Sequence, residues 1–133
     1  MVEQLQAAGH SFCSEVDGQQ VPTAGDLWSL YQTMVGIWPA RPVDAAEKAA
    51  LSERLQQYKI KAMREAKVAT NWLFPHEAYE AAVTRYIGHC LASRRFVGVL
   101  EDFVQRIAPC GYRNSLCQVA LKLTCPGVPD IYQ

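Results

Sequence analysis

The chain contains five cysteines and three histidines, residue types that often bind metals or take part in nucleophilic chemistry. Their spacing does not match that of a metal site, because no C-x-x-C pair occurs and no cysteine has a histidine at zinc-finger spacing. The histidines stand singly along the chain. We therefore expect no metal site. We also expect reduced cysteines that pack as small apolar side chains, with oxidation of one pair as the alternative. These residues are Cys13, Cys90, Cys110, Cys117, Cys125, His10, His76 and His89.

The carboxylates form no catalytic pattern either. Most fall on segments of helical periodicity among lysines and arginines, which is typical of a solvated helix face. No serine sits in a nucleophile elbow, no glycine-rich loop could cradle a phosphate, and no two acids share a strand end. We expect no catalytic residue and no cofactor in this chain. The acids assigned to the surface are Glu47, Glu53, Glu65, Glu77, Glu80, Glu101 and Asp102.

Length and composition indicate one globular domain. A chain of 133 residues should bury roughly 65–70% of the surface that it exposes unfolded, enough for a single core. Half of the residues are apolar, and 13 basic residues balance 13 acidic ones. This balance gives no basic patch for nucleic acid or an anionic membrane. No apolar run is long enough to span a bilayer, so we expect a cytoplasmic location.

Helical periodicity dominates the chain. Apolar residues line one face from Leu27 to Trp38, with Asp26 as the expected N-cap and Pro39 as the stop. Asp44 and Glu47 have capping-box spacing and begin a long predicted helix. Its expected face carries Leu51, Leu55, Tyr58, Ala62 and Ala66, and it ends near residue 69.

Three more helices are expected. One starts at Pro75 and buries Tyr79, Ala82, Val83, Tyr86, Ile87, Cys90 and Leu91. The next carries Phe96, Leu100, Phe103, Val104 and Ile107 before Pro109 and Gly111 interrupt it. Asn114 or Ser115 then caps a short helix, residues 116–123, with Leu116, Ala120 and Leu123 inward.

The predicted fold is all-α, a compact bundle of about five helices crossing at large angles within one domain, residues 1–133. Residues 1–25 are expected to form a short helix and a loop, with Asp17 and Gly18 at a turn, and residues 26–124 the helical core. Residues 127–133 read as a strand stub, because Val128, Ile131 and Tyr132 favour strands. A strand needs a sheet, so we expect a short extended segment left from an excised barrel, in a piece of a longer polypeptide.

Three blocks of sequence resemble the maltooligosyl trehalose synthases of the α-amylase clan. They are LYQTMVGIWP at residues 30–39, YKIKAMREAK at 58–67 followed by Thr70-Asn71-Trp72, and residues 114–133, which end in PGVPDIYQ. The resemblance covers about residues 15–133, and this part of the chain is similar to the C-terminal third of these enzymes. Asn71 stands where serine is expected, and Cys125 where a small residue such as alanine is commoner.

The resemblance implies a (β/α)8-barrel isomerase. Such an enzyme converts the reducing-end α-1,4 linkage of a maltooligosaccharide into an α,α-1,1 trehalose linkage by intramolecular transglucosylation. The catalytic nucleophile, the acid/base and a supporting aspartate would come from barrel strands preceding residue 1. The chain would then shape the substrate cleft, and by itself we expect it to be inactive.

Four residues are candidate substrate contacts under this resemblance. Sugar rings stack on aromatic side chains while cationic side chains donate to hydroxyls, so Arg64, Lys67 and Trp72 could converge. Tyr132 would lie in the eighth barrel strand, near the catalytic end. The plainer alternative for Arg64 and Lys67 is that they complement the helix dipole. We assign Trp28 and Trp38 to the core, and Asn114 and Gln118 to helix capping and packing.

A second reading needs no enzyme. The chain could be a free-standing helical protein-interaction module whose exposed apolar surface meets a partner. In the enzyme that surface would meet the barrel domain of the same polypeptide, and maltooligosaccharide would be the ligand. On its own, we expect the chain to self-associate as a dimer through the C-terminal tail, because unpaired strand edges template association.

Overall fold

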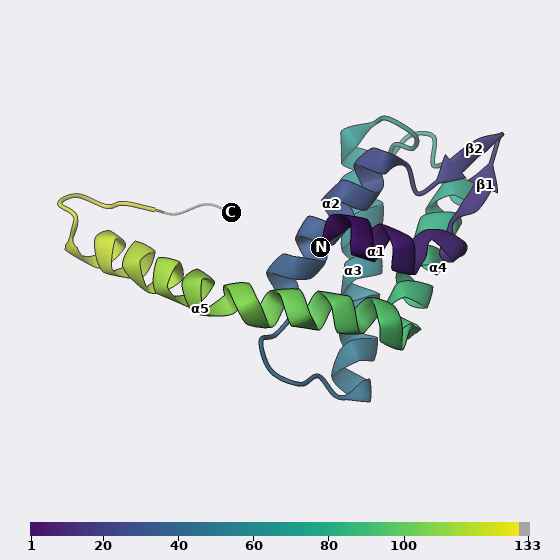
Figure 1. Ribbon diagram of the computed structural model, residues 1–133. Coiled ribbons are helices and arrows are strands. Elements are labelled where there is room, and N and C mark those ends of the chain that lie inside the picture. The colour runs from purple at the N-terminus through teal and green to yellow at the C-terminus, as the bar shows by residue number, and fades with distance from the viewer. Residues whose placement is uncertain (131–133) are drawn as a thin grey trace.

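The computed structural model describes residues 1–130, and a helical body dominates it (Figure 1). The elements, in chain order, are α1 (Val2–Gly9), a 3-10 turn (His10–Phe12), β1 (Ser14–Val16), β2 (Gln19–Val21), α2 (Ala24–Ile37), α3 (Ala45–Ala66), α4 (Glu77–Ala92) and α5 (Arg94–Thr124). The predicted all-α class is confirmed. None of the helices described is long and apolar enough to cross a bilayer.

A small β-hairpin interrupts the region where only a helix and a loop were expected. β1 and β2 pair antiparallel, with Ser14 opposite Val21. Asp17 and Gly18 both have positive φ, 52° and 75°, the conformation that a two-residue hairpin turn requires. The prediction of a loop here was wrong, because the three-residue strands are too short to show a clear alternation.

Helix α2 presents the apolar face that its sequence predicts. Leu27, Leu30, Tyr31 and Met34 are buried, and Trp38 is buried just beyond the helix. Thr23, not Asp26, is the N-cap. The two residues form a capping box in which Asp26 occupies the third helical position.

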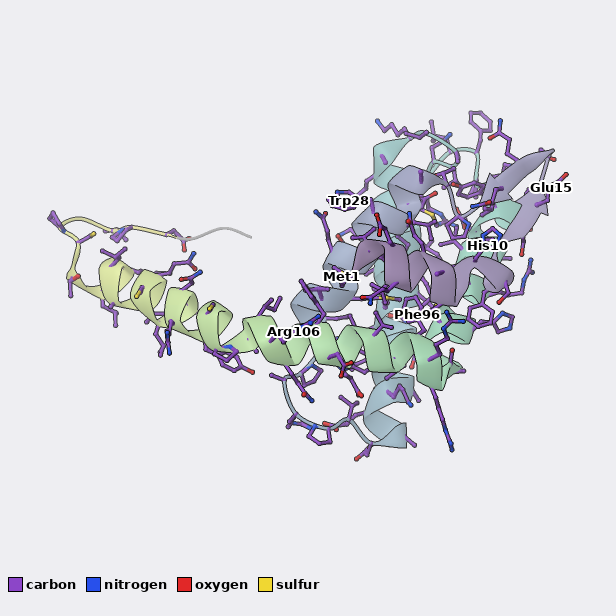
Figure 2. All side chains as sticks on the ribbon, viewed as in Figure 1. Met1, His10, Glu15, Trp28, Phe96 and Arg106 are labelled. Carbon is purple, nitrogen blue, oxygen red and sulfur yellow. The ribbon has the colours of Figure 1, made fainter. Side chains whose placement is uncertain are left out.

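Trp28 also lies on α2, beside its buried face. Its side chain is 55% exposed (labelled in Figure 2), so the prediction that Trp28 belongs to the core was wrong. Trp28 follows directly after the buried Leu27, and consecutive residues of an α-helix point about 100° apart, so Trp28 falls outside the buried face. Periodicity, more than residue type, decides which of the two is covered.

Helix α3 begins at the predicted capping box of Asp44 and Glu47. It ends at Ala66, three residues before the expected end, because Lys67 adopts a left-handed conformation with φ of 56°. Its buried residues are Leu55, Lys59 and Met63. The expected face was therefore partly wrong: Tyr58 is half exposed, and the charged Lys59 takes an interior position.

Helix α4 forms the centre of the core. All seven residues predicted to be buried on it are buried. The Tyr86 hydroxyl pairs with that of Tyr31 on α2 at 2.8 Å, so both phenols are satisfied in the interior. His76, not Pro75, precedes the first residue of the helix. The Nδ1 atom of His76 accepts from the Tyr79 amide at 3.3 Å.

Helix α5 is one helix where two were expected. It continues through Pro109 to Thr124. Proline removes one helical hydrogen bond, but this part of the helix is exposed, so water can reach the freed carbonyl.

The distal half of α5, from Pro109 onward, extends away from the other helices (Figure 1), and in Figure 2 its side chains project into open space. Leu116, Ala120 and Leu123 are exposed, so the expectation that they face inward was wrong. Asn114 and Ser115 cap nothing, because the helix is continuous there, and Gln118 is likewise exposed rather than packed.

Candidate functional site

Several exposed apolar side chains lie together in the segment between α3 and α4. Val68, Trp72, Leu73 and Phe74 are all exposed, and Trp72 keeps 54% of its surface open. We call residues 68–74 the aromatic loop. Exposed apolar side chains gathered in one loop often mark a binding surface, so the question is whether this loop has a fixed shape.

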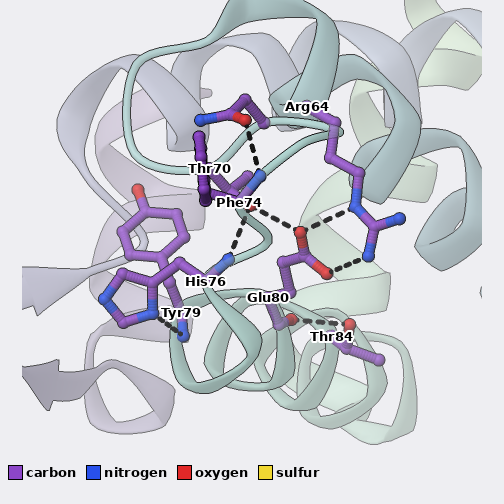
Figure 3. Close-up of polar contacts among 8 residues, drawn as sticks. Arg64, Thr70, Phe74, His76, Tyr79, Glu80 and Thr84 are labelled. Atoms are coloured by element: carbon purple, nitrogen blue, oxygen red, sulfur yellow. Dashed lines mark hydrogen bonds and ion pairs between the residues drawn. The ribbon is translucent and has the colours of Figure 1, made fainter.

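Asparagine and threonine side chains fix the backbone of the aromatic loop. The Asn71 Oδ1 atom accepts from the amides of Leu73 and Phe74, at 3.0 and 2.8 Å, which forms an Asx turn. The Thr70 hydroxyl accepts from the His76 amide at 2.9 Å and donates to Glu80 Oε1 at 2.6 Å (Figure 3). The loop is therefore tied to the first turns of α4.

Glu80 anchors this arrangement from within. Its carboxylate accepts two hydrogen bonds from Arg64: Nε to Oε1 at 2.8 Å and Nη2 to Oε2 at 2.7 Å. Glu80 is only 6% exposed. The Arg64 hydrogen bonds lower the pKa of Glu80 below its ordinary value, against the opposing effect of burial. The expectation of a solvated Glu80 was wrong, because its position borders the buried face of α4.

Arg64 also holds Trp72. The Arg64 guanidinium carbon lies 5.0 Å from the centroid of the Trp72 ring, within the range of a cation–π contact. One guanidinium thus connects the buried carboxylate of α4 to the exposed indole of the aromatic loop. Arg64 therefore supports the Trp72 ring from one side, and the part of Trp72 that remains exposed is available to a ligand.

The four predicted contact residues have different outcomes. Arg64 and Trp72 lie together, as the sequence predicts. Lys67 is exposed at the end of α3, and its ammonium makes no hydrogen bond or ion pair within residues 1–130. Tyr132 lies outside the described residues. Whether any of them contacts a ligand stays a prediction.

Thr70, Glu80 and His76 complete the site and were missed by sequence reasoning. His76 donates from Nε2 to Asp17 Oδ2 at 2.8 Å, because its Nδ1 is the acceptor at the start of α4. This contact joins the hairpin turn to the aromatic loop. The one sequence feature that indicated burial of Glu80 is its position between Tyr79 and Val83, at the edge of the predicted buried face of that helix.

The potential metal ligands among the described residues do not cluster, and the cysteines differ in exposure. No group of three or more potential metal ligands occurs within residues 1–130. All five cysteines are free, as expected, but Cys110, Cys117 and Cys125 are exposed, so the expectation that they pack as apolar side chains was wrong for these three. Cys90 is buried, and its burial raises the thiol pKa to about 12, so it behaves as an apolar side chain rather than a nucleophile.

Comparison with known proteins relates this geometry to a family. No protein-family model matches the chain. Proteins of two Mycobacterium tuberculosis strains, provisionally named maltooligosyl trehalose synthase, are 36% identical to it over 104 residues, 78% of this chain. A crystal structure of a hypothetical maltooligosyl trehalose synthase from Sulfolobus tokodaii covers 99% of the chain with 32% identity and a TM-score of 0.76. The chain is homologous to one segment of maltooligosyl trehalose synthases.

The synthase relatives are much longer than this chain. The chain spans 13% of the length of the Mycobacterium tuberculosis proteins and 17% of the Sulfolobus tokodaii structure. The resemblance predicted from three sequence blocks is confirmed, in sequence and in fold.

Proposed function

We propose that this chain is the helical domain of a cytoplasmic maltooligosyl trehalose synthase and forms one wall of its substrate cleft. The observation that carries the proposal is the near-complete structural match of this chain to only 17% of a protein with that name. The reaction would be the intramolecular transfer that turns a reducing-end α-1,4 linkage into an α,α-1,1 linkage. Residues 1–133 would act as a single helical unit within it.

The aromatic loop supports the role of a cleft wall. A sugar ring has an apolar face that packs on an aromatic side chain, and it gains most when that side chain is already held in place. Trp72 is half open and its ring is held by Arg64. The Asx turn and the Thr70–Glu80 bond fix the backbone around it.

The acids of this chain do not suit the chemical step. Retaining transfer between sugars needs a nucleophilic carboxylate and a general acid about 5–5.5 Å apart, the acid with a raised pKa. The two acids drawn into the interior, Asp26 and Glu80, both have lowered pKa values and are paired with Lys59 and Arg64. The proposal therefore assigns the catalytic acids to the remainder of the enzyme.

The distal half of α5 supports a contact with that remainder. Tyr112, Leu116, Val119 and Leu123 recur at steps of four, three and four, on one stripe of the helix, and all are exposed. An unpacked helix of this length is marginal in water, and only Arg113 and Lys122 carry charge between residues 107 and 125. We propose that this stripe packs against the barrel domain of the same polypeptide.

A chimaera tests the proposed function. This chain would replace the matching segment of the Sulfolobus tokodaii protein, and loss of reducing ends from maltopentaose would be followed. We expect conversion by the chimaera and none above the uncatalysed rate by the chain alone. Turnover by the chain alone, with contaminating enzyme excluded, would overturn the assignment of the acids.

Two tryptophans of equal exposure provide a matched control. In the chimaera, Trp72→Ala should raise the KM for maltopentaose, because a stacking surface is lost. Trp28→Ala removes an equally exposed indole, 55% against 54%, from α2, outside the aromatic loop. It should leave the KM unchanged. Equal effects of the two substitutions would contradict a cleft role for the aromatic loop.

The same exposed stripe on α5 favours one alternative, a free-standing interaction module that forms a two-fold dimer. Open apolar surface of this kind tends to find a partner. Sedimentation at tens of micromolar would compare the full chain with a version ending at Thr124. A dimer that dissociates on truncation supports a contact through the tail, a dimer that persists supports a contact through the stripe, and a monomeric full chain contradicts self-association.

A further inference from the structure

A cavity of about 410 Å³ lies between β2, α2, α3, α4 and the aromatic loop. Its lining combines apolar side chains, among them Ala62, Ala66, Val68 and Ala69, with polar ones, among them Gln19, Asp26, Ser29 and Lys59. This volume lies in the range of small-molecule sites, and the cavity is separate from the exposed surface of Trp72, which does not line it.

A buried lysine, Lys59, lines the cavity. Lys59 is 4% exposed. Its Nζ atom lies 3.2 Å from Asp26 Oδ1 and 3.4 Å from Ser29 Oγ. An ammonium has three N–H donors, and no third acceptor within residues 1–130 contacts this one. Because an unpaired buried donor is costly, the third N–H calls for an oxygen supplied from the cavity.

The charges of Lys59 and Asp26 restrict which ligands the cavity can bind. Burial disfavours the Asp26 carboxylate, but hydrogen bonds from Tyr79 and Thr23 and the charge of Lys59 outweigh it, so the pKa of Asp26 is lowered. The lysine and aspartate charges therefore cancel. An anion would meet Asp26 and a cation would meet Lys59, so neither gains a net attraction. A neutral ligand with hydroxyl groups can pair with both.

We propose that this cavity binds one neutral hexopyranose unit. The ring would lie with its apolar face toward Ala62 and Ala66. A hydroxyl oxygen would accept the free Lys59 donor, and other hydroxyls would pair with Ser29 and Gln19. The inference rests on the proposed function and deepens it, because it assigns a sugar site to this chain besides the open surface of Trp72.

Titration of the chain with methyl α-D-glucopyranoside, followed by amide resonances, tests the site. We expect saturable shifts concentrated at the cavity. Ala62→Leu should place a larger side chain where the apolar face of the ring would lie, without altering the ion pair, and weaken binding at least about tenfold, which corresponds to about 1.4 kcal/mol. Ala50→Leu, the same change at an exposed position of α3, should leave the affinity unchanged. Glucose 6-phosphate should bind no more tightly than the neutral glucoside.

The outcomes separate this inference from the proposed function. Shifts confined to Trp72 and its neighbours would overturn the cavity site and leave the cleft role of the aromatic loop standing. Unchanged affinity in Ala62→Leu, tighter binding of the phosphate ester, or no saturable shift at the cavity would each overturn it as well. An inactive chimaera beside saturable shifts at the cavity would instead count against the proposed function alone.

Discussion

Replacing Glu80 with glutamine should destabilise the chain and loosen the aromatic loop. Glu80 accepts three hydrogen bonds, two from Arg64 and one from Thr70. A glutamine oxygen can keep the bonds to Arg64 Nε and Thr70, but its amide nitrogen then faces Arg64 Nη2, donor against donor. The substitution removes one charge-assisted hydrogen bond and leaves a donor unpaired, so we expect a loss of about 2–3 kcal/mol.

Urea unfolding at neutral pH measures this loss, which corresponds to a fall in Tm of roughly 6–15 °C for a domain of this size. The indole N–H resonance of Trp72 should shift at the same time, because Arg64 loses its bidentate anchor. Glu65→Gln serves as the control. Glu65 is exposed and its ion pair with Lys61 spans 3.8 Å, so its loss should not be measurable.

The destabilisation caused by Glu80→Gln should also depend on pH and become smaller as the pH falls. The pKa of Glu80 is lowered in the folded chain, so its stabilising effect is complete above the unfolded pKa near 4.5. It is lost as the pH falls through the lowered folded value. The difference between the two chains should be constant from pH 7 to about 5.5 and shrink toward pH 3. A difference below about 1 kcal/mol at pH 7, or one that persists to pH 3, would refute the reasoning.

Three further outcomes are expected. Gly9→Ala should cost about 1–3 kcal/mol in urea unfolding, because its methyl would overlap the Tyr86 hydroxyl. Tyr86→Phe in the same chain should recover part of that loss, and a Gly9→Ala chain of unchanged stability would disprove the clash. Burial and the hydrogen bond to Asp26 raise the pKa of Tyr79 to about 12, so stability should fall from pH 10 upward, and less steeply in Tyr79→Phe. Limited trypsin digestion should cut first after Arg113 and Lys122, on the exposed half of α5, whereas early cleavage within α3 would contradict this order.

Sequence alone determined the features that depend on neighbours a few residues apart. The apolar face of α2 and the complete buried face of α4 follow from a period of 3.6 residues. The capping box at Asp44 follows from the spacing of two side chains. The family relationship also lay in the sequence, because three ordered blocks carry it. The pairing of Arg64 with Trp72 was anticipated, since Arg64 lies near the C-terminal end of a predicted helix and Trp72 in the loop that follows it.

Only the tertiary structure decided which polar groups enter the interior. Lys59 and Glu80 look like surface residues in the sequence, because the partners that allow their burial, Asp26 and Arg64, lie on other helices. A pattern along one helix carries no information about an ion pair between two helices. The same holds for α5. Proline predicts a break, but whether a helix tolerates it depends on access of water to the freed carbonyl and on what packs against the helix. Both are properties of the folded molecule.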